Sequence, residues 1–185
     1  GVVDRDGTII NGGYPGTTNR RFTLNSAGSV LEALTITNGY ERATGGGGVY
    51  MTAGLVTNCV VTGNVSTNGG GGGVYMTAGT LSSCVVTGNV ATNGHGGGVS
   101  MAGGTLSRCA VLNNATKVGN AGGVYVTGPG CVITNCEVVG NTAQGQGGGL
   151  HFNNVTVSVG DSQIVRNTST SSGGGISMYA ATALL

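Results

Sequence analysis

The sequence predicts an all-β fold: a right-handed single-stranded parallel β-helix of six to seven coils, with 25–27 residues in each coil. A glycine triplet followed by a short apolar run recurs, and the third glycines of successive triplets are 25 or 26 residues apart (Gly48, Gly73, Gly98, Gly123, Gly149 and Gly175). A second apolar run closes at an asparagine in step with the first. No stretch has a helical period over about 11 residues. Units this short cannot bury an apolar face alone, so we expect them to stack.

We expect a single domain over residues 1–185, in which the coils differ in regularity. Residues 1–45 form degenerate first coils, where "GTIINGG" and "FTLNSAGSVLEALTITN" are worn copies of the unit and Leu34 takes the position of Cys59. Residues 46–172 form the regular coils, and residues 173–185 form a partial last coil. Parallel crossovers are generally right-handed, which predicts the hand of the winding.

Alternation along each strand predicts which side chains enter the core. In "GVYM", Val74 and Met76 point inward and Tyr75 outward, and in "CVV" Cys84 and Val86 point inward. Stacking then aligns equivalent residues of successive coils into apolar rows. The three expected rows are Val49, Val74, Val99, Val124, Leu150 and Ile176; Met51, Met76, Met101, Val126, Phe152 and Met178; and Val61, Val86, Val111, Val138 and Ile164.

The repeated glycines and asparagines are predicted to form the turns of the coils. Glycine tolerates positive φ and close backbone approach better than any other residue. The closing asparagines have two interpretations: each takes a left-handed turn conformation, or its amide stacks and bonds the backbone of the next coil. They are Asn64, Asn89, Asn114, Asn141 and Asn167.

Composition excludes several classes of protein. The 40 glycines do not recur at every third position, which excludes collagen, and 38% apolar residues in periodic order argue against a disordered linker. A net charge of +1 without a basic patch gives no basis for nucleic-acid binding, and no apolar run is long enough to span a membrane. No lysine or aspartate follows a triplet as phosphate-binding or calcium-binding repeats require. We therefore expect no cofactor and no metal.

Five cysteines fall in two settings. Cys59, Cys84, Cys109 and Cys136 share one inward position, which Ser162 takes in the next coil. A linear row suits neither tetrahedral zinc nor good disulfide geometry, so core packing is the preferred interpretation. Cys131 lies in the lengthened segment "TGPGC" and could pair with Cys136 or Cys109, because spacing does not fix the connectivity.

The sequence contains no evident catalytic constellation, so we predict that the chain is not an enzyme. Polysaccharide-cleaving chemistry needs carboxylates that converge in one groove, and the coils from Gly46 to about Gly96 contain no Asp, Glu, Lys or Arg. The outward residues Tyr50, Tyr75, Tyr125 and His151 instead form a candidate strip for a surface glycan or a protein partner. The alternative is a half-exposed strand surface, which tyrosine suits.

The two ends of the repeat show no capping helix and no polar terminal repeat. Open edges of a solenoid template further strand pairing. Either these residues are a section of a longer β-helix, or the last coil of one copy docks head to tail on the first coil of the next. The candidate residues for end-to-end assembly are Val2, Val3, Ile176, Met178, Leu184 and Leu185.

The pairing of a GG-[GA]-[VIL] element with an x-G-N-x-[AST] element, as in "VVTGNVS", resembles the repeats of polymorphic outer-membrane proteins. It is also similar to Gly-rich repeats of bacterial surface proteins with pectate-lyase-like right-handed β-helices. The resemblance covers roughly residues 22–180. It implies a right-handed β-helix in an exported bacterial protein, extracellular or at the cell surface. The predicted function is therefore a structural rod, a self-assembling fibre subunit or an adhesin segment. The alternative is a carbohydrate-binding or polysaccharide-cleaving β-helix.

Overall fold

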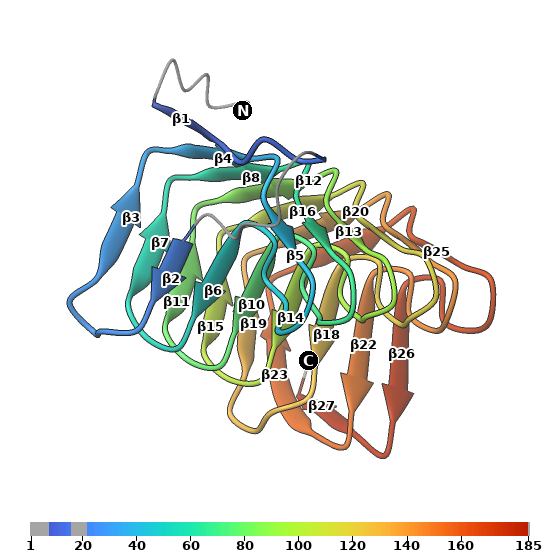
Figure 1. Cartoon of the computed structure of the whole chain (residues 1–185). Helices are drawn as coiled ribbons and strands as arrows, with labels where there is room; N and C mark the ends of the chain where they lie inside the picture. The colour runs from blue at the N-terminus through green and yellow to red at the C-terminus, as the bar shows by residue number, and fades with distance from the viewer. Residues whose placement is uncertain (1–7, 16–21, 185) are drawn as a thin grey trace.

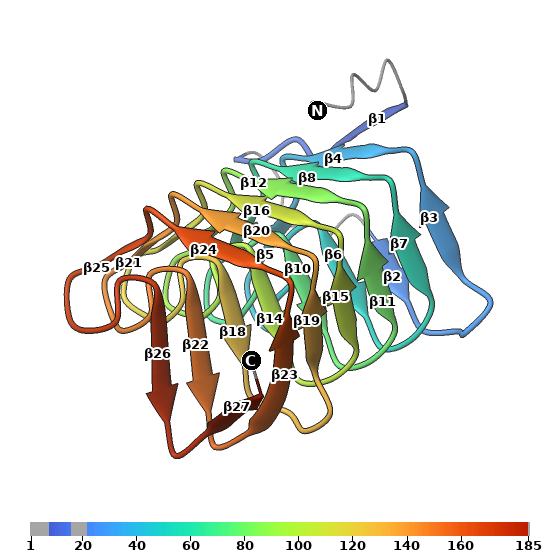
Figure 2. The same ribbon diagram turned by 180° about the vertical axis from the view of Figure 1, so that it is seen from behind.

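The chain forms a four-sided parallel β-solenoid of about seven coils (Figure 1). This architecture comes from a computed structural model that describes residues 8–15 and 22–184. Successive coils stack along one axis, from β3 (Val30–Glu32) at one end to β26 (Ile176–Tyr179) at the other, and the view from behind shows the same stack (Figure 2). The all-β solenoid predicted from the repeat is confirmed.

Four sheets, each taking one strand from a coil, form the sides of the solenoid. Sheet A contains β1 (Ile9–Asn11), β4 (Thr35–Thr37), β8 (Val60–Thr62), β12 (Val85–Thr87), β16 (Ala110–Leu112), β20 (Glu137–Val139) and β24 (Gln163–Val165). Sheet B contains β2 (Phe22–Leu24), β6 (Val49–Met51), β10 (Val74–Met76), β14 (Val99–Met101), β18 (Val124–Val126), β22 (Leu150–Asn153) and β26.

The other two sheets were not identified from the repeat pattern. Sheet C contains β3, β7 (Leu55–Thr57), β11 (Thr80–Ser82), β15 (Thr105–Ser107), β19 (Val132–Thr134), β23 (Thr156–Gly160) and β27 (Thr182–Leu184). Sheet D contains β5 (Tyr40–Glu41), β9 (Val65–Ser66), β13 (Val90–Ala91), β17 (Ala115–Thr116), β21 (Thr142–Ala143) and β25 (Thr168–Ser169). The part of the chain that the structure describes contains no helix that could cross a membrane.

The predicted apolar rows have the predicted register and occupy the core up to the last coil, where Ile164 and Ile176 are half-buried and Met178 is exposed. Val74 pairs with Val49 and Val99, and Met76 pairs with Met51 and Met101. These residues are fully buried, as is Val86 of the third row, whereas Tyr75 is half-buried on the outer face. The degenerate first copies of the repeat also join the stack, because β1 pairs with β4. The carbonyl of Leu34 accepts from the amide of Val60, as the carbonyl of Cys59 accepts from the amide of Val85 one coil later.

Left-handed residues mark the corners of each coil. One precedes each inward cysteine or its Ser162 replacement (Asn58, Ser83, Arg108, Asn135 and Asp161), and another precedes each closing asparagine (Gly63, Gly88, Asn113, Gly140 and Arg166). A single residue with positive φ turns the chain sharply, which lets the strands on either side lie in different sheets.

The closing asparagines form a buried ladder of hydrogen bonds between coils. The Asn114 Oδ1 atom accepts bonds from the backbone amide of Asn89, at 2.9 Å, and from Asn89 Nδ2, at 3.0 Å. Asn114 Nδ2 donates to Val86 O and to Asn141 Oδ1. The same bonds recur at Asn64, Asn89 and Asn141. Of the two interpretations of these asparagines, the stacked amide is therefore confirmed, and the left-handed conformation belongs to the preceding residue.

The glycine triplets are turns, as predicted, and their residues have two distinct tasks. The first position of each triplet has positive φ, which is 66° at Gly71. The second position lies against neighbouring backbone: a Cβ atom on Gly72 would be 2.4 Å from Gly97 O and 2.5 Å from Val90 C. Side chains are therefore excluded from the second position by the close approach of adjacent coils.

Candidate functional site

The outer face of sheet B carries the candidate strip, and its residues align across the coils. Tyr50 pairs with Tyr75, and Tyr125 pairs with His151. The rings of Tyr50 and Tyr75 stack at 5.4 Å between centroids with an interplanar angle of 5°. Ser100 lies between Tyr75 and Tyr125 and interrupts the aromatic row. As a partner or glycan surface the strip stays a prediction.

The glycine-rich loops between sheets D and B bury the second half of this row. His95, in the loop after β13, stacks on Tyr125 with 4.5 Å between ring centroids, and Tyr125 lies 5.5 Å from His151. As a result, Tyr125 is 8% exposed and His151 only 2%. These two rings present little surface to a large partner, whereas Tyr50 and Tyr75 are half-buried.

Asn120 links the two imidazoles. Its backbone amide donates to His95 Nδ1 at 2.9 Å, and its Nδ2 atom lies 3.5 Å from His151 Nε2. The Asn120 Oδ1 atom accepts a bond from the backbone amide of Gln146 at 2.8 Å, which fixes the orientation of the Asn120 amide. Both imidazoles therefore accept from Asn120, and the proton of neutral His151 is on Nδ1, which is buried without a hydrogen-bond partner.

The electrostatics of the two histidines agree with this arrangement. Burial lowers the pKa of His95 below its ordinary value of 6.5. Burial, and secondarily the proximity of His95, lowers the pKa of His151. Desolvation disfavours the imidazolium form, so both rings are neutral at pH 7. A neutral ring is the state that can accept the bonds offered by Asn120.

A polar hollow of about 460 Å³, which we call the amide cleft, opens beside this cluster at the C-terminal end of sheet B. Its lining residues are Asn120, Gly145, Gln146, His151, Asn153, Ser171 and Tyr179. None of them is a carboxylate, lysine or arginine. The Tyr179 side chain, at the end of β26, is 62% exposed.

Except for His151, sequence reasoning missed the residues of the amide cleft. Asn120 and Gln146 occupy the position immediately before the triplet in successive coils, where earlier coils have Gly45, Gly70 and His95. Asn153 and Tyr179 lie one residue beyond the predicted Phe152–Met178 row and pair with each other. A search for repeat positions that change from glycine to polar residues would have identified the first pair.

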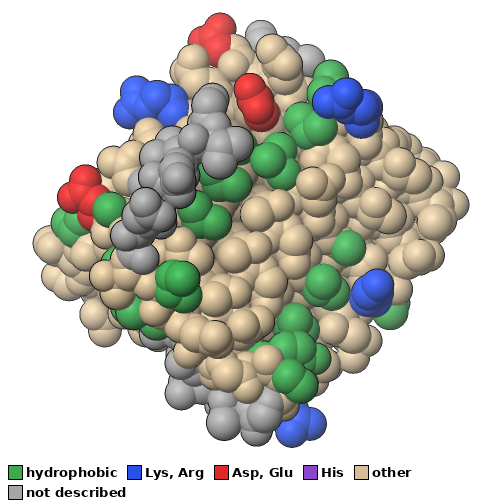
Figure 3. Space-filling model, turned by 90° about the horizontal axis from the view of Figure 1, so that it is seen from above, with side chains coloured by type: hydrophobic (Ala, Val, Ile, Leu, Met, Phe, Trp, Pro, Cys, Tyr) green, Lys and Arg blue, Asp and Glu red, His purple; other side chains and the backbone are tan. Residues whose placement is uncertain are grey.

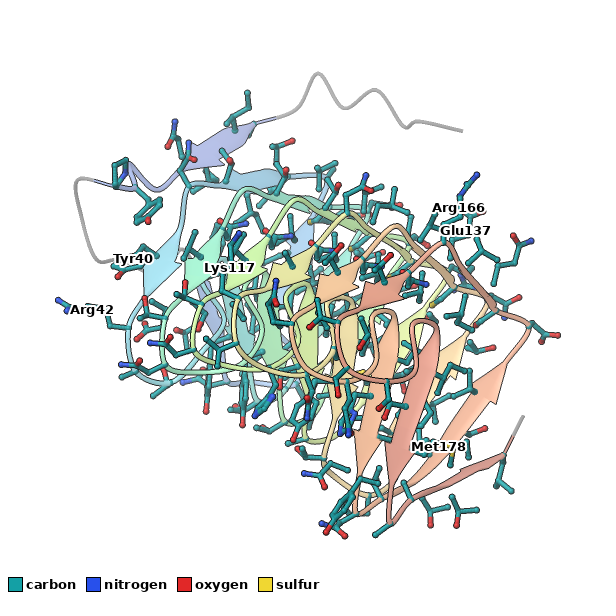
Figure 4. All side chains as sticks on the ribbon, turned by 90° about the vertical axis from the view of Figure 1, so that its right-hand side faces the viewer. Tyr40, Arg42, Lys117, Glu137, Arg166 and Met178 are labelled. Atoms are coloured by element: carbon teal, nitrogen blue, oxygen red, sulfur yellow. The ribbon has the colours of Figure 1, made fainter. Side chains whose placement is uncertain are left out.

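A second groove, of about 540 Å³, lies over sheet A. It is lined by Leu112, Asn113, Glu137, Val139, Gly140 and Arg166, and Figure 4 shows Glu137 and Arg166 at the same edge of the molecule. Seen from above, acidic and basic side chains are scattered over this face (Figure 3). Within residues 8–15 and 22–184, no group of three or more His, Cys, Asp or Glu residues could hold a metal ion. The groove contains one carboxylate, whereas glycosidic cleavage ordinarily needs two. The sequence has two further acidic residues close together, Asp4 and Asp6, which lie outside the described residues.

The cysteine row is a packed part of the core. All five cysteines are free and buried, including Cys131. Each thiol of the row contacts the preceding coil. Cys84 Sγ accepts from the Cys59 amide, and Ser162 Oγ, in the same position one coil after Cys136, accepts from the Cys136 amide. The pKa of Cys84 is raised to about 12, chiefly by its hydrogen bond with Cys109. The pKa of Cys131 is raised to about 11 by burial. Protonated thiols of this kind are poor nucleophiles.

Each of the four described sheets ends in one strand at either end of the solenoid. β1, β2, β3 and β5 are at one end of their sheets, and β24, β26, β27 and β25 are at the other. Met178, labelled in Figure 4, is 46% exposed. Leu184 is 62% exposed and Ile176 is half-buried. The remaining candidate assembly residues, Val2, Val3 and Leu185, lie outside the described residues.

Comparisons with family models, with curated proteins and with solved structures give no match to this chain. The parallel solenoid is shown by the strand pairing in the structure and not by similarity to a known protein. The resemblance to polymorphic outer-membrane and pectate-lyase-like repeats receives no support from these comparisons, and the right-handed sense stays a prediction.

Proposed function

We propose that this chain is a structural rod whose coils stack end to end with those of further copies, as a subunit of a fibre or an adhesin. The observation that carries the proposal is the uniform parallel pairing of all four sheets. Because every coil repeats the one before it by translation, the edges at one end have the polarity needed to continue those at the other. A contact of this kind is heterologous and gives an open filament.

The chemistry of the last coil also supports stacking. Natural edge strands are commonly protected by charged residues or proline. Residues 167–184, which include β25, β26 and β27, contain no charged residue and no proline. The apolar rows reach this end at Ile176 and Met178, so a docked coil would cover apolar surface and satisfy unpaired backbone groups together. A secreted or cell-surface location is proposed from the repeat resemblance alone.

Electron microscopy of the purified chain tests the proposal. Seven coils at ~4.8 Å each predict filaments with an axial repeat of about 34 Å. The double substitution Met178→Lys and Leu184→Lys places charges on the edge and is expected to abolish filaments. Val118→Lys is the matched control, because Val118 is an exposed apolar residue in a lateral loop. Monomers at about 100 μM, a concentration that reveals micromolar contacts, would refute self-assembly.

A further inference from the structure

We propose that the amide cleft binds an uncharged, polyhydroxylated ring, that is, a neutral saccharide unit, with the ring of Tyr179 as its stacking platform and the amides of Gln146 and Asn153 as its hydrogen-bonding partners. Tyr179 and Ser171 belong to the last coil, whose edge is also used in the proposed end-to-end contact, but ligand binding in the cleft does not require stacking. The lining residues retain hydrogen-bonding capacity, none is a carboxylate, lysine or arginine, and the ring of Tyr179 is exposed.

The lining residues are held in place by bonds that leave part of their capacity unused. Gln146 Oε1 accepts from Ser177 Oγ at 3.3 Å, and among the described residues Gln146 Nε2 has no hydrogen-bond partner. Asn153 Nδ2 donates to Tyr125 Oη at 3.0 Å, and this bond fixes the orientation of the Asn153 amide. Asn153 Oδ1 accepts one bond from Asn154 Nδ2 and has a second lone pair available. The cleft therefore offers both a fixed donor and a fixed acceptor, and a hydroxyl group can satisfy both.

Charge selects between classes of polar ligand. Phosphates and carboxylates are bound in proteins mainly by arginine, lysine or helix N-termini, and cations by carboxylates. The amide cleft has none of these, and its histidine is held as a neutral acceptor by Asn120. An ion in the cleft would be partly desolvated without a counter-charge, whereas a neutral hydroxylated ligand incurs no such cost.

Tyr179 adds the apolar component that a sugar ring requires. Its side chain is 62% exposed at the rim of the cleft, and β26 fixes its backbone beside Asn153. Aromatic rings with a polar end are suited to ligands that have one apolar face and a polar rim. The volume of about 460 Å³ is within the range of small-molecule sites and accommodates one or two rings rather than a long chain.

This assignment moves the recognition site away from the outward tyrosine strip. Tyr125 and His151 are buried and serve as the floor and support of the cleft, with Tyr125 Oη positioning Asn153. Tyr50 and Tyr75 lie at the other end of sheet B and stack on each other. A cleft ligand and a strip ligand therefore predict different effects of substitution at Tyr179 and Tyr75.

The test is a titration of the ¹⁵N-labelled full chain with methyl glucoside, methyl mannoside and N-acetylglucosamine, observed through backbone and side-chain amide signals. We expect saturable shifts of the side-chain amides of Gln146 and Asn153 with at least one sugar. Tyr179→Ala should weaken binding about threefold to tenfold. Tyr75→Ala, the matched control on the same sheet, should leave the affinity unchanged. Circular dichroism verifies that both variants are folded.

Three results would overturn the proposal. The first is the absence of saturable shifts with all three sugars up to about 50 mM, which excludes sites of millimolar affinity. The second is an equal loss of affinity in Tyr75→Ala and Tyr179→Ala. The third is an equal response of the same amides to glucuronate or inorganic phosphate, which would show that the cleft does not select for neutral ligands. Filament formation is measured separately, so failure of the titration leaves the stacking proposal standing.

Discussion

Removal of one rung from the asparagine ladder is predicted to cost a large part of the stability of the solenoid. In Asn114→Ala, four hydrogen bonds are lost: two that Asn114 Oδ1 accepts from Asn89 and two that Asn114 Nδ2 donates to Val86 and Asn141. Asn89 is fully buried, so its backbone amide and one hydrogen on its Nδ2 atom are left without partners and without water.

The magnitude follows from the two orphaned donors. Each buried unsatisfied donor costs about 1–3 kcal/mol, so the free energy of unfolding should fall by about 2–6 kcal/mol. A typical domain has only about 5–15 kcal/mol in total. The matched control is Asn93→Ala, because Asn93 is exposed and its amide donates to Asn68 on the surface at 3.2 Å. Loss of that bond should change the free energy by less than about 0.5 kcal/mol.

Urea unfolding followed by far-ultraviolet circular dichroism and by tyrosine fluorescence measures both variants. Coincident transitions with unchanged m-values would allow the free energies to be compared directly. If Asn114→Ala proves to be within about 1 kcal/mol of Asn93→Ala, the ladder does not stabilise the coils in the way argued here.

Two further predictions concern the close contacts between coils and the histidine cluster. Gly72→Ala should unfold or severely destabilise the chain, because the new Cβ would meet backbone atoms at 2.4–2.5 Å, whereas Gly28→Ala, with nothing within 4 Å, should be neutral or slightly stabilising in the same thermal melt. Stability should also fall as the pH drops below about 6.5, since the folded-state pKa values of His95 and His151 are lowered and the unfolded chain binds more protons there. Urea midpoints between pH 7.5 and 5 measure this loss, His151→Phe should reduce it, and an identical slope in that variant would count against the assignment.

The repeat alone was sufficient to predict the core of the solenoid. The period of 25–26 residues fixes the register, and alternation then assigns Val74 and Met76 to the core, because a shift by one residue would expose both. Sheets C and D escaped prediction, each for a different reason. Strands such as β11 mix threonine and serine with one leucine, and strands such as β13 contain only two residues. Neither provides a periodic signal long enough to recognise.

The amide cleft could not have been predicted from periodicity. It joins residues from the loops and strand ends of successive coils, and its polarity comes from departures from the repeat, such as Asn120 and Gln146 in place of glycine. The outward position of Tyr125 and His151 was predictable from alternation, but their burial was not. It depends on His95, which reaches the neighbouring coil from a loop.

The near-identity of adjacent coils creates a problem of alignment during folding. Val49, Val74 and Val99 are equivalent partners in one row, so a chain paired one whole coil out of place would still form the same ladders there. Only irregular segments distinguish the correct alignment from its shifted copies. Cys109 and Cys136 are 27 residues apart rather than 25, Phe152 replaces a methionine, and β23 extends to five residues. A chain shifted by one coil would be mismatched at these positions, which disfavours the shifted alignments.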